Sequence, residues 1–155
     1  MKISILAIGQ RQPRWADEAT ADVLKRFPPD FAVVLREFKP EARDGRDVER
    51  IRAAEGERLR AALPAGCVRV ALDERGRDLT SAAFAEQLGR WRDAGENPAF
   101  LIGGPDGLAD ELRRGANLVL RLSSLTLPHA LARVLLVEQL YRGWSILHRH
   151  PYHRA

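Results

Sequence analysis

The sequence predicts an α/β fold: a mainly parallel sheet of five to six strands with helices on both faces. Short apolar runs of strand length alternate along the chain with longer amphipathic segments of helical length. Turns rich in glycine or proline separate most of these segments. The chain has 155 residues and shows no internal repeat or linker, so we expect a single domain over residues 1–155.

The first half of the chain alternates strand and helix twice. A nearly continuous apolar run ends at Gly9, as expected for a buried parallel strand. Pro13 can open a helix, which Pro28 stops after Phe27. Asp47 can cap a second helix. We therefore expect strands at 3–8 and 31–38, and helices at 15–27 and 47–63. The polar loop Pro40–Arg46, between the second strand and the second helix, is the best candidate for a mobile segment.

The second half continues the same alternation. Thr80 or Ser81 can cap a helix that runs through Trp91 and stops at Gly95. The segment from Asp73 to Gly76 is turn-like and should end the third strand. We expect strands at 67–72, 99–102 and 118–122, and further helices at 108–115 and 128–148.

Composition excludes several classes of protein. Hydrophobic residues make up 45% and charged residues 30%, which is typical of a globular protein and excludes disordered and collagen-like chains. No apolar run approaches the roughly 18–20 residues that span a bilayer, and the first segment does not resemble a signal peptide. The single cysteine, Cys67, fits a reducing compartment. We expect a cytoplasmic protein with no membrane partner.

The charge pattern fits either a nucleic-acid partner or a GC-rich genome. The net charge is +4, and only three of the 25 basic residues are lysines. Arginine contacts phosphate through two donors, although a GC-rich genome would produce the same bias. All four histidines lie in the last part of the chain, among arginines and aromatic residues. Such a basic and aromatic surface is typical of nucleic-acid binding.

Three loops follow predicted strand ends and form the best candidate for a small-molecule site. They are Leu72–Asp73, Gly103–Gly107 and Leu122–Leu127. In open α/β sheets, ligands bind beyond the carboxyl ends of the strands. The glycine loop matches neither a dinucleotide fingerprint nor a P-loop. It can therefore be a shelf that lets backbone approach a ligand, or a plain turn between strand and helix.

The last predicted helix is apolar on nearly every face. One sheet face cannot cover such a helix, so we expect a homodimer with this helix at its interface, the alternative being a deep core position. Glu138 and Arg142 are spaced i,i+4 within it. They can form an exposed ion pair or a buried pair, or Arg142 can bind phosphate.

The C-terminal tail contains His148, His150 and His153, with no cysteine and no acidic residue beside them. Neighbouring Arg149 and Arg154 would repel a cation, so we expect no metal site. A solvated tail remains the alternative to a functional one. We expect its removal to cost little core packing.

The motifs LIGGPDGL, SLTLPHALARVLLVEQLYRGWSI and HPYHR closely resemble the ribosomal large subunit methyltransferase H family of the SPOUT class. The similarity spans the chain, including MKISILAIGQRQPRWADEA and LKRFPPD near its start. The resemblance implies a C-terminal trefoil knot, a homodimer whose site uses both subunits, and S-adenosylmethionine as methyl donor without a metal. It implies methylation of N3 of a pseudouridine in 23S rRNA on assembled ribosomes. The loop EARDGRD departs from the lysine- and glycine-rich version of the relatives, which leaves its RNA contacts open.

The resemblance also implies roles for single residues. A side chain at Gly103 or Gly104 would occupy the space of the adenosine. It implies that five residues lie near the target base: His129, Arg142, Tyr152, His153 and Arg154. The cofactor site it implies is Leu72, Gly103, Gly104, Leu122, Ser123, Ser124, Leu125, Thr126 and Leu127.

The implied chemistry requires a proton acceptor, because the N3 imino group of a uracil-type base carries a proton. His153 could accept that proton, Arg142 or Arg154 could stabilise the developing anion or bind phosphate, and Tyr152 could stack on the base. A non-catalytic RNA-binding or ribosome-assembly module and a nucleotide-binding enzyme of another class remain as rival functions.

Overall fold

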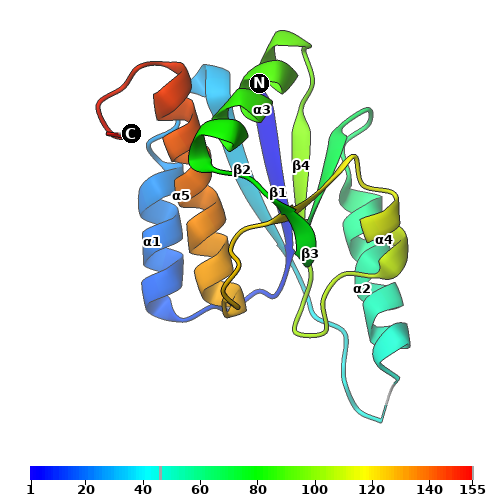
Figure 1. The fold of residues 1–155 in the computed structure, drawn as a ribbon. Coiled ribbons are helices and arrows are strands. Elements are labelled where there is room, and N and C mark those ends of the chain that lie inside the picture. The colour runs from blue at the N-terminus through cyan, green and yellow to red at the C-terminus, as the bar shows by residue number, and fades with distance from the viewer. Residues whose placement is uncertain (46, 155) are drawn as a thin grey trace.

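The computed structural model describes residues 1–45 and 47–154. Within them, five parallel strands form one sheet in the order β2-β1-β4-β3-β5. Helices cover both faces of this sheet (Figure 1), so the predicted α/β class is confirmed. In chain order the elements are β1 (Lys2–Ile8), α1 (Arg14–Leu24), the 3-10 turn η1 (Pro29–Phe31), β2 (Ala32–Phe38), α2 (Val48–Ala62), β3 (Val68–Asp78), α3 (Ser81–Asp93), β4 (Pro98–Ile102), α4 (Asp110–Arg114), β5 (Leu118–Arg121) and α5 (His129–Leu147).

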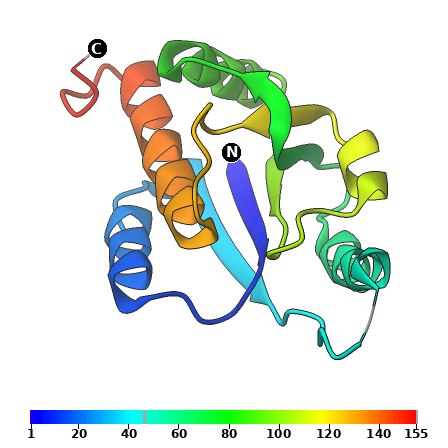
Figure 2. The same ribbon diagram turned by 60° about the horizontal axis from the view of Figure 1, so that its bottom comes forward.

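Each face of the sheet has its own apolar core, because side chains of a strand alternate between the faces. Ile3, Ile5 and Phe100 belong to the core under α1, α3 and α5. Leu6 and Leu101 belong to the second core, under α2 and α4. Figure 2 shows these two groups of helices on opposite sides of the strands. The molecule therefore has three layers, with the strands buried in the middle.

The predicted helix caps are confirmed, whereas two helices are shorter than predicted. Asp47 accepts a hydrogen bond from the Glu49 N–H at 3.3 Å, and Thr80 accepts one from the Ala83 N–H at 3.0 Å. α1 ends at Leu24 rather than Phe27, because the chain then tightens into a turn in which the Arg26 N–H donates to the Val23 carbonyl at 3.0 Å. α4 spans only Asp110–Arg114, because the preceding residues still belong to the glycine loop.

β3 is longer than predicted, and the prediction that it ends in a turn from Asp73 to Gly76 was wrong. Leu120 of β5 pairs with both Leu72 and Arg77, so the residues between them bulge out of the sheet while the strand continues. Gly76 permits this close approach, because a Cβ there would lie 2.7 Å from the backbone of Leu120. The bulge carries its side chains to the edge where the strands end.

α5 lies against α1 and α3, and much of its apolar surface is covered within one chain. Leu136 and Leu140 are fully buried, whereas Leu131 at the start of the helix is 40% exposed. The homodimer stays a prediction, and the intrachain core explains part of the apolar pattern. No helix within the described ranges is long and apolar enough to cross a membrane.

Candidate active site

A cavity of about 570 Å³ lies at the carboxyl ends of three neighbouring strands, β4, β3 and β5. The three loops singled out from the sequence meet there. Ser124 is exposed and lies outside the lining. The other predicted cofactor residues line the cavity: Leu72, Gly103, Gly104, Leu122, Ser123, Leu125, Thr126 and Leu127.

The glycine loop folds back on itself, which corrects the reason expected for its glycines. A Cβ at Gly103 would lie 2.5 Å from the Gly107 carbonyl carbon. A Cβ at Gly104 would meet the carboxylate of Glu55 at 3.1 Å and Ile8 at 3.2 Å, rather than the cavity. Gly107 has a φ of +83°, which favours glycine, and its N–H donates to the Gly104 carbonyl. The glycines are thus required by the loop's own backbone and by the layer beneath it.

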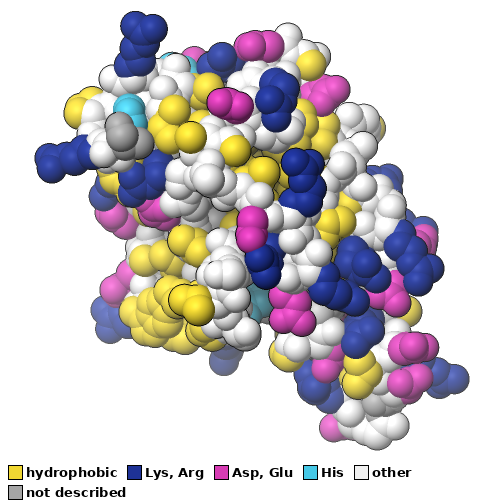
Figure 3. Space-filling view, viewed as in Figure 1, with side chains coloured by type: hydrophobic (Ala, Val, Ile, Leu, Met, Phe, Trp, Pro, Cys, Tyr) yellow, Lys and Arg dark blue, Asp and Glu magenta, His cyan; other side chains and the backbone are white. Residues whose placement is uncertain are grey.

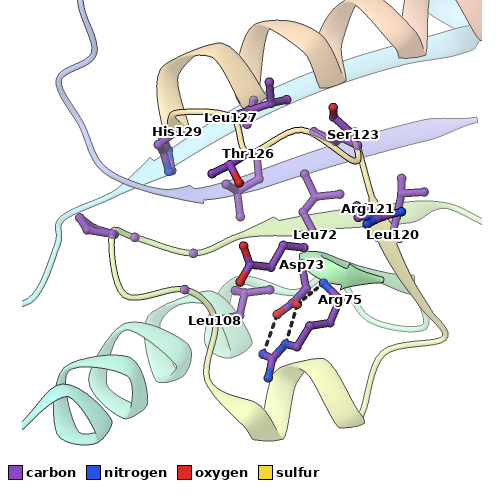
Figure 4. Close-up of a pocket in the computed structure, with 18 of the residues that line it drawn as sticks. Leu72, Asp73, Arg75, Leu108, Leu120, Arg121, Ser123, Thr126, Leu127 and His129 are labelled. Atoms are coloured by element: carbon purple, nitrogen blue, oxygen red, sulfur yellow. Dashed lines mark hydrogen bonds and ion pairs between the residues drawn. The ribbon is translucent and has the colours of Figure 1, made fainter. Parts of the chain in front are cut away.

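The bulge of β3 provides a fixed carboxylate at the rim of the cavity (Figure 4). Asp73 accepts hydrogen bonds from the backbone N–H and the guanidinium of Arg75, at 2.8 to 3.0 Å. These hydrogen bonds hold the pKa of Asp73 below its ordinary value. Arg75 was not among the predicted site residues, because the sequence there reads as a turn. The cavity thus combines an ionised group with the apolar side chains of Leu72, Leu108 and Leu120.

A buried carboxyl group supports the glycine loop from below. Glu55 of α2 is 3% exposed and accepts a hydrogen bond from the Glu41 N–H at 3.0 Å. Its Oε1 has no hydrogen-bond partner in the described part of the chain, and burial raises the pKa of this carboxyl. The loop predicted to be mobile is therefore attached to α2. Its last residue, Arg46, lies outside the described residues.

A second link joins the same loop to the glycine loop. The guanidinium of Arg43 donates to the carboxylate of Asp106 at 2.9 Å, and Arg52 of α2 donates to the Asp106 carbonyl at 2.8 Å. Residues 40–45 and the glycine loop are consequently held against the same helix.

His129 is the one predicted base-contacting residue that lines the cavity. It is the first residue of α5 and lies beside Thr126 in Figure 4. Its Nε2 accepts a hydrogen bond from Arg133 Nε at 2.9 Å. Burial, followed by the charge of Arg133, lowers the pKa of His129 to about 4. The imidazole is therefore neutral at physiological pH.

The other predicted residues cluster at the opposite end of α5. Arg142 pairs with Glu138 at 2.7 Å and donates to the His153 carbonyl at 2.9 Å. Tyr152 donates to the same Glu138 carboxylate at 2.9 Å, and the Arg142 guanidinium lies 5.1 Å from its ring centre. Arg154 is exposed beside them. Glu138 joins this group as its central acceptor, and of the alternatives left open for the i,i+4 pair the structure has a partly buried ion pair.

This C-terminal cluster is remote from the cavity of its own chain. Arg142 follows His129 by thirteen positions in the helix, which corresponds to about 20 Å along the axis. The structure therefore brings Arg142, Tyr152 and His153 together, and leaves His129 apart from them.

The tail is packed rather than free, so the expectation of little lost packing was wrong. Tyr152 contacts Tyr141 edge to face, with ring centres 4.8 Å apart. The ring centre of His150 lies 5.3 Å from that of Trp144.

Among residues 1–45 and 47–154, no three acidic, histidine or cysteine side chains are arranged to hold a metal ion.

Charged and apolar side chains divide the surface around the cavity. Figure 3 shows charged side chains of both signs over the side of the molecule that α2 and α4 form, and apolar side chains over the side of α1 and the start of α5. Trp15 is 54% exposed on α1, and Leu125 is 75% exposed in the loop before α5. The apolar side therefore borders the cavity.

A family profile described as "Predicted SPOUT methyltransferase" matches residues 1–153. The chain belongs to the SPOUT methyltransferase family. It is 53% identical to a protein of Bordetella petrii and 54% identical to one of Bordetella pertussis, with each alignment covering 100% of both chains. A protein of Leptothrix cholodnii is 54% identical, over 99% of both chains. All three relatives are named "Ribosomal RNA large subunit methyltransferase H".

Solved structures support the fold of this SPOUT family member. A probable methylase family protein of Haemophilus influenzae superposes with a TM-score of 0.55 at 15% identity, covering 97% of this chain and 68% of that one. A putative methylase family protein of Neisseria gonorrhoeae gives a TM-score of 0.51 at 14% identity, covering 90% and 80%. At such low identity the likeness concerns the fold alone.

Proposed function

We propose that this SPOUT methyltransferase transfers the methyl group of S-adenosylmethionine to N3 of a pseudouridine in 23S rRNA. The observation that carries the proposal is the cavity where the three strand-end loops meet. The full-length relatives named as large-subunit rRNA methyltransferases support the choice of RNA substrate. The resemblance of the C-terminal motifs supports the pseudouridine target, the assembled ribosome as substrate and a cytoplasmic location.

The residues of the cavity fit S-adenosylmethionine. A volume of about 570 Å³ is in the range of small-molecule sites, roughly 300–1,000 Å³. Leu72, Leu120 and Leu127 provide apolar walls for an adenine. The backbone of Gly103–Gly104 and of the loop 122–127 provides donors and acceptors for the ribose and the amino acid. Ser123 and Thr126 add hydroxyl groups, and Ser124 would join them if the loop adjusted on binding.

The bound methyl donor supplies an electrophilic sulfonium methyl group, and the protein must prepare the nucleophile. N3 carries a proton that has to leave as the nitrogen attacks. His153 is our candidate proton acceptor, because its Nδ1 is buried without a hydrogen-bond partner among the described residues. Arg142 and Arg154 would stabilise the developing negative charge or bind phosphate, and Tyr152 would stack on the base.

The separation of the two ends of α5 supports a site that uses both subunits of a homodimer. Within one chain, about 20 Å of helix lies between His129 and Arg142. We propose that the C-terminal cluster of one subunit completes the cavity of its partner. The exposed apolar side chains beside the cavity, Leu125 and Leu131, support an interface at this edge.

Mixed dimers test this arrangement. We would combine a subunit carrying Gly104→Val with a subunit lacking residues 152–155, each inactive alone. Methylation of ribosomes by the mixture, near half of the wild-type activity per mixed dimer, is expected if one intact site forms across the interface. An inactive mixture would contradict the shared site.

Calorimetry separates the proposed function from its rivals. The wild-type protein should bind S-adenosylmethionine and methylate assembled ribosomes. Ribosome binding without cofactor binding would instead indicate a non-catalytic RNA-binding module, and binding of neither would exclude the proposal.

A further inference from the structure

Arg133 is a buried cation in α5 that the chemistry above does not use. Its side chain is 3% exposed and forms an ion pair with Glu37 of β2. It also donates to the carbonyls of Gly9, at 2.6 Å, and Ile8, at 3.3 Å. Burying a guanidinium is costly unless its donors are satisfied, and here carboxylate, carbonyl and imidazole acceptors surround it. One side chain thus links α5 to the ends of two strands.

The remaining donor of Arg133 determines the state of His129. A guanidinium only donates hydrogen bonds, so the Nε2 that accepts from it at 2.9 Å must carry a lone pair. The ring proton is then on Nδ1. The imidazole also makes a hydrogen bond to the Gly103 backbone, and this bond favours the protonated ring, as donation to a carbonyl does. His129 therefore accepts from Arg133 and donates to Gly103.

These contacts form a continuous connection from the far strand to the glycine loop. Glu37 on β2 holds Arg133, Arg133 holds His129, and His129 holds the Gly103 carbonyl. Gly103 lines the cavity. The charged groups that face the imidazole are Arg133 from α5 and, behind it, Glu37 from β2.

We propose that Arg133 is a positioning residue for the cofactor pocket: it fixes His129 as the neutral Nδ1–H tautomer, which in turn holds the Gly103 carbonyl and the start of α5. The proposal rests on the proposed function for the identity of the ligand only. It also gives His129 the role of a hydrogen-bond donor, since its one lone pair is occupied. The proton acceptor for N3 must then come from the C-terminal cluster.

The decisive variant is Arg133→Met combined with Glu37→Gln, which removes both members of the ion pair and leaves no buried charge. Arg133→Lys is the second variant, because an ammonium group keeps the charge but cannot reach all four acceptors. Arg90→Met, at an exposed position on α3, is the matched control. Thermal melting establishes that each variant is folded.

Nitrogen NMR of the imidazole is the first readout. In the wild type, His129 should be the Nδ1–H tautomer and neutral at pH 6. In the double variant, its titration midpoint should rise by about one pH unit or more and the tautomers should mix. Arg90→Met should match the wild type. A folded double variant in which His129 keeps the wild-type tautomer and titration would overturn the proposal.

Calorimetric binding of S-adenosylmethionine is the second readout. We expect affinity for S-adenosylmethionine to fall about tenfold in the double variant and less in Arg133→Lys, because the glycine loop loses the hydrogen bond that positions Gly103. Unchanged affinity in both variants would overturn the positioning role. If the wild type does not bind S-adenosylmethionine, the proposed function fails, and the imidazole readout still decides whether Arg133 fixes His129.

Discussion

At the scale of single residues, the glycine loop is determined by what lies beneath it. Gly104 faces the buried Glu55 and Ile8, and Gly103 faces the returning backbone of its own loop. A side chain at either position would displace the loop rather than enter the cavity directly. The pocket is thus sensitive to substitution even though these Cβ positions point away from it.

Gly104→Val should abolish measurable binding of S-adenosylmethionine in calorimetry, because a branched side chain must push the loop away from contacts of 3.1 to 3.3 Å. Gly104→Ala should weaken binding less. Gly89→Ala is the control, since its Cβ would meet only the end of the Leu147 side chain. Normal affinity in a folded Gly104→Val protein would show that the loop adapts.

The pH dependence of protein stability should reveal the lowered pKa of His129. Its pKa of about 4 in the folded protein lies below the ordinary 6.5, so folding favours the neutral ring. The stability that folding gains from the neutral ring is complete above about pH 6.5 and is lost as pH falls toward 4. After allowance for solvent screening, we expect a loss of about 2 kcal/mol.

Urea unfolding of the wild type and of His129→Gln, from pH 7.5 to 4, measures that difference. Glutamine can accept a hydrogen bond from Arg133 and donate one to Gly103 without titrating. The stability of the His129→Gln protein should therefore fall less steeply over this range. Glu55 acts in the opposite direction, since its raised pKa favours folding at low pH in both proteins. Parallel profiles for the two proteins would contradict the assigned state of His129.

At the scale of elements, the C-terminal segment behaves as an extension of α5. Tyr152 packs on Tyr141 and donates to Glu138, while Arg142 holds the His153 carbonyl. The segment therefore has a defined structure before any RNA is bound. Its side chains are oriented by the last turns of the helix.

Deleting residues 152–155 should lower the free energy of unfolding by about 2–3 kcal/mol, because it removes the aromatic contact with Tyr141 and the hydrogen bonds to Glu138 and from Arg142. Cofactor affinity should remain unchanged, because the cavity lies at the other end of α5. Methyl transfer to ribosomes should fall about 10²–10⁴-fold if the segment contains the general base.

Turnover assays and urea unfolding of the same preparations check both parts of this prediction. Arg149→Ala is the control, since that exposed residue precedes the packed segment. Full activity in the shortened protein would remove His153 as the proton acceptor.

At the scale of the whole molecule, the surface has two different sides. Charged side chains of both signs cover α2 and α4, and exposed apolar side chains lie on α1 and the start of α5. The arginines on the charged side suit contacts with an RNA backbone, and the apolar side suits a second subunit. The trefoil knot implied by the resemblance stays a prediction.

We expect the protein to be a dimer at micromolar concentration in light scattering, and Leu131→Arg to be a monomer. Val48→Arg is the matched control, because Val48 is 39% exposed and Leu131 40% exposed, and Val48 lies in α2, on the charged side of the molecule. A monomeric wild type, or a Leu131→Arg protein that remains dimeric, would place the interface elsewhere or exclude it.

The sequence by itself was sufficient for the α/β class, the order of strands and helices, and the three loops that meet at the cavity. Local patterns determine these features: apolar runs of strand length, capping residues such as Asp47 and Thr80, and glycines after a strand. Because parallel strands end at the same edge of a sheet, loops after them converge without further information.

Only the tertiary structure determined the bulge of β3, the packed tail and the connection from Glu37 through Arg133 to His129. Each depends on residues far apart in sequence: Leu120 opposite Leu72 and Arg77, or Glu37 beside Arg133. No local pattern distinguishes a buried arginine from an exposed one within an apolar helix. Burial and pairing are properties of the assembled layers, and they decide which charges are neutralised and which groups reach the site.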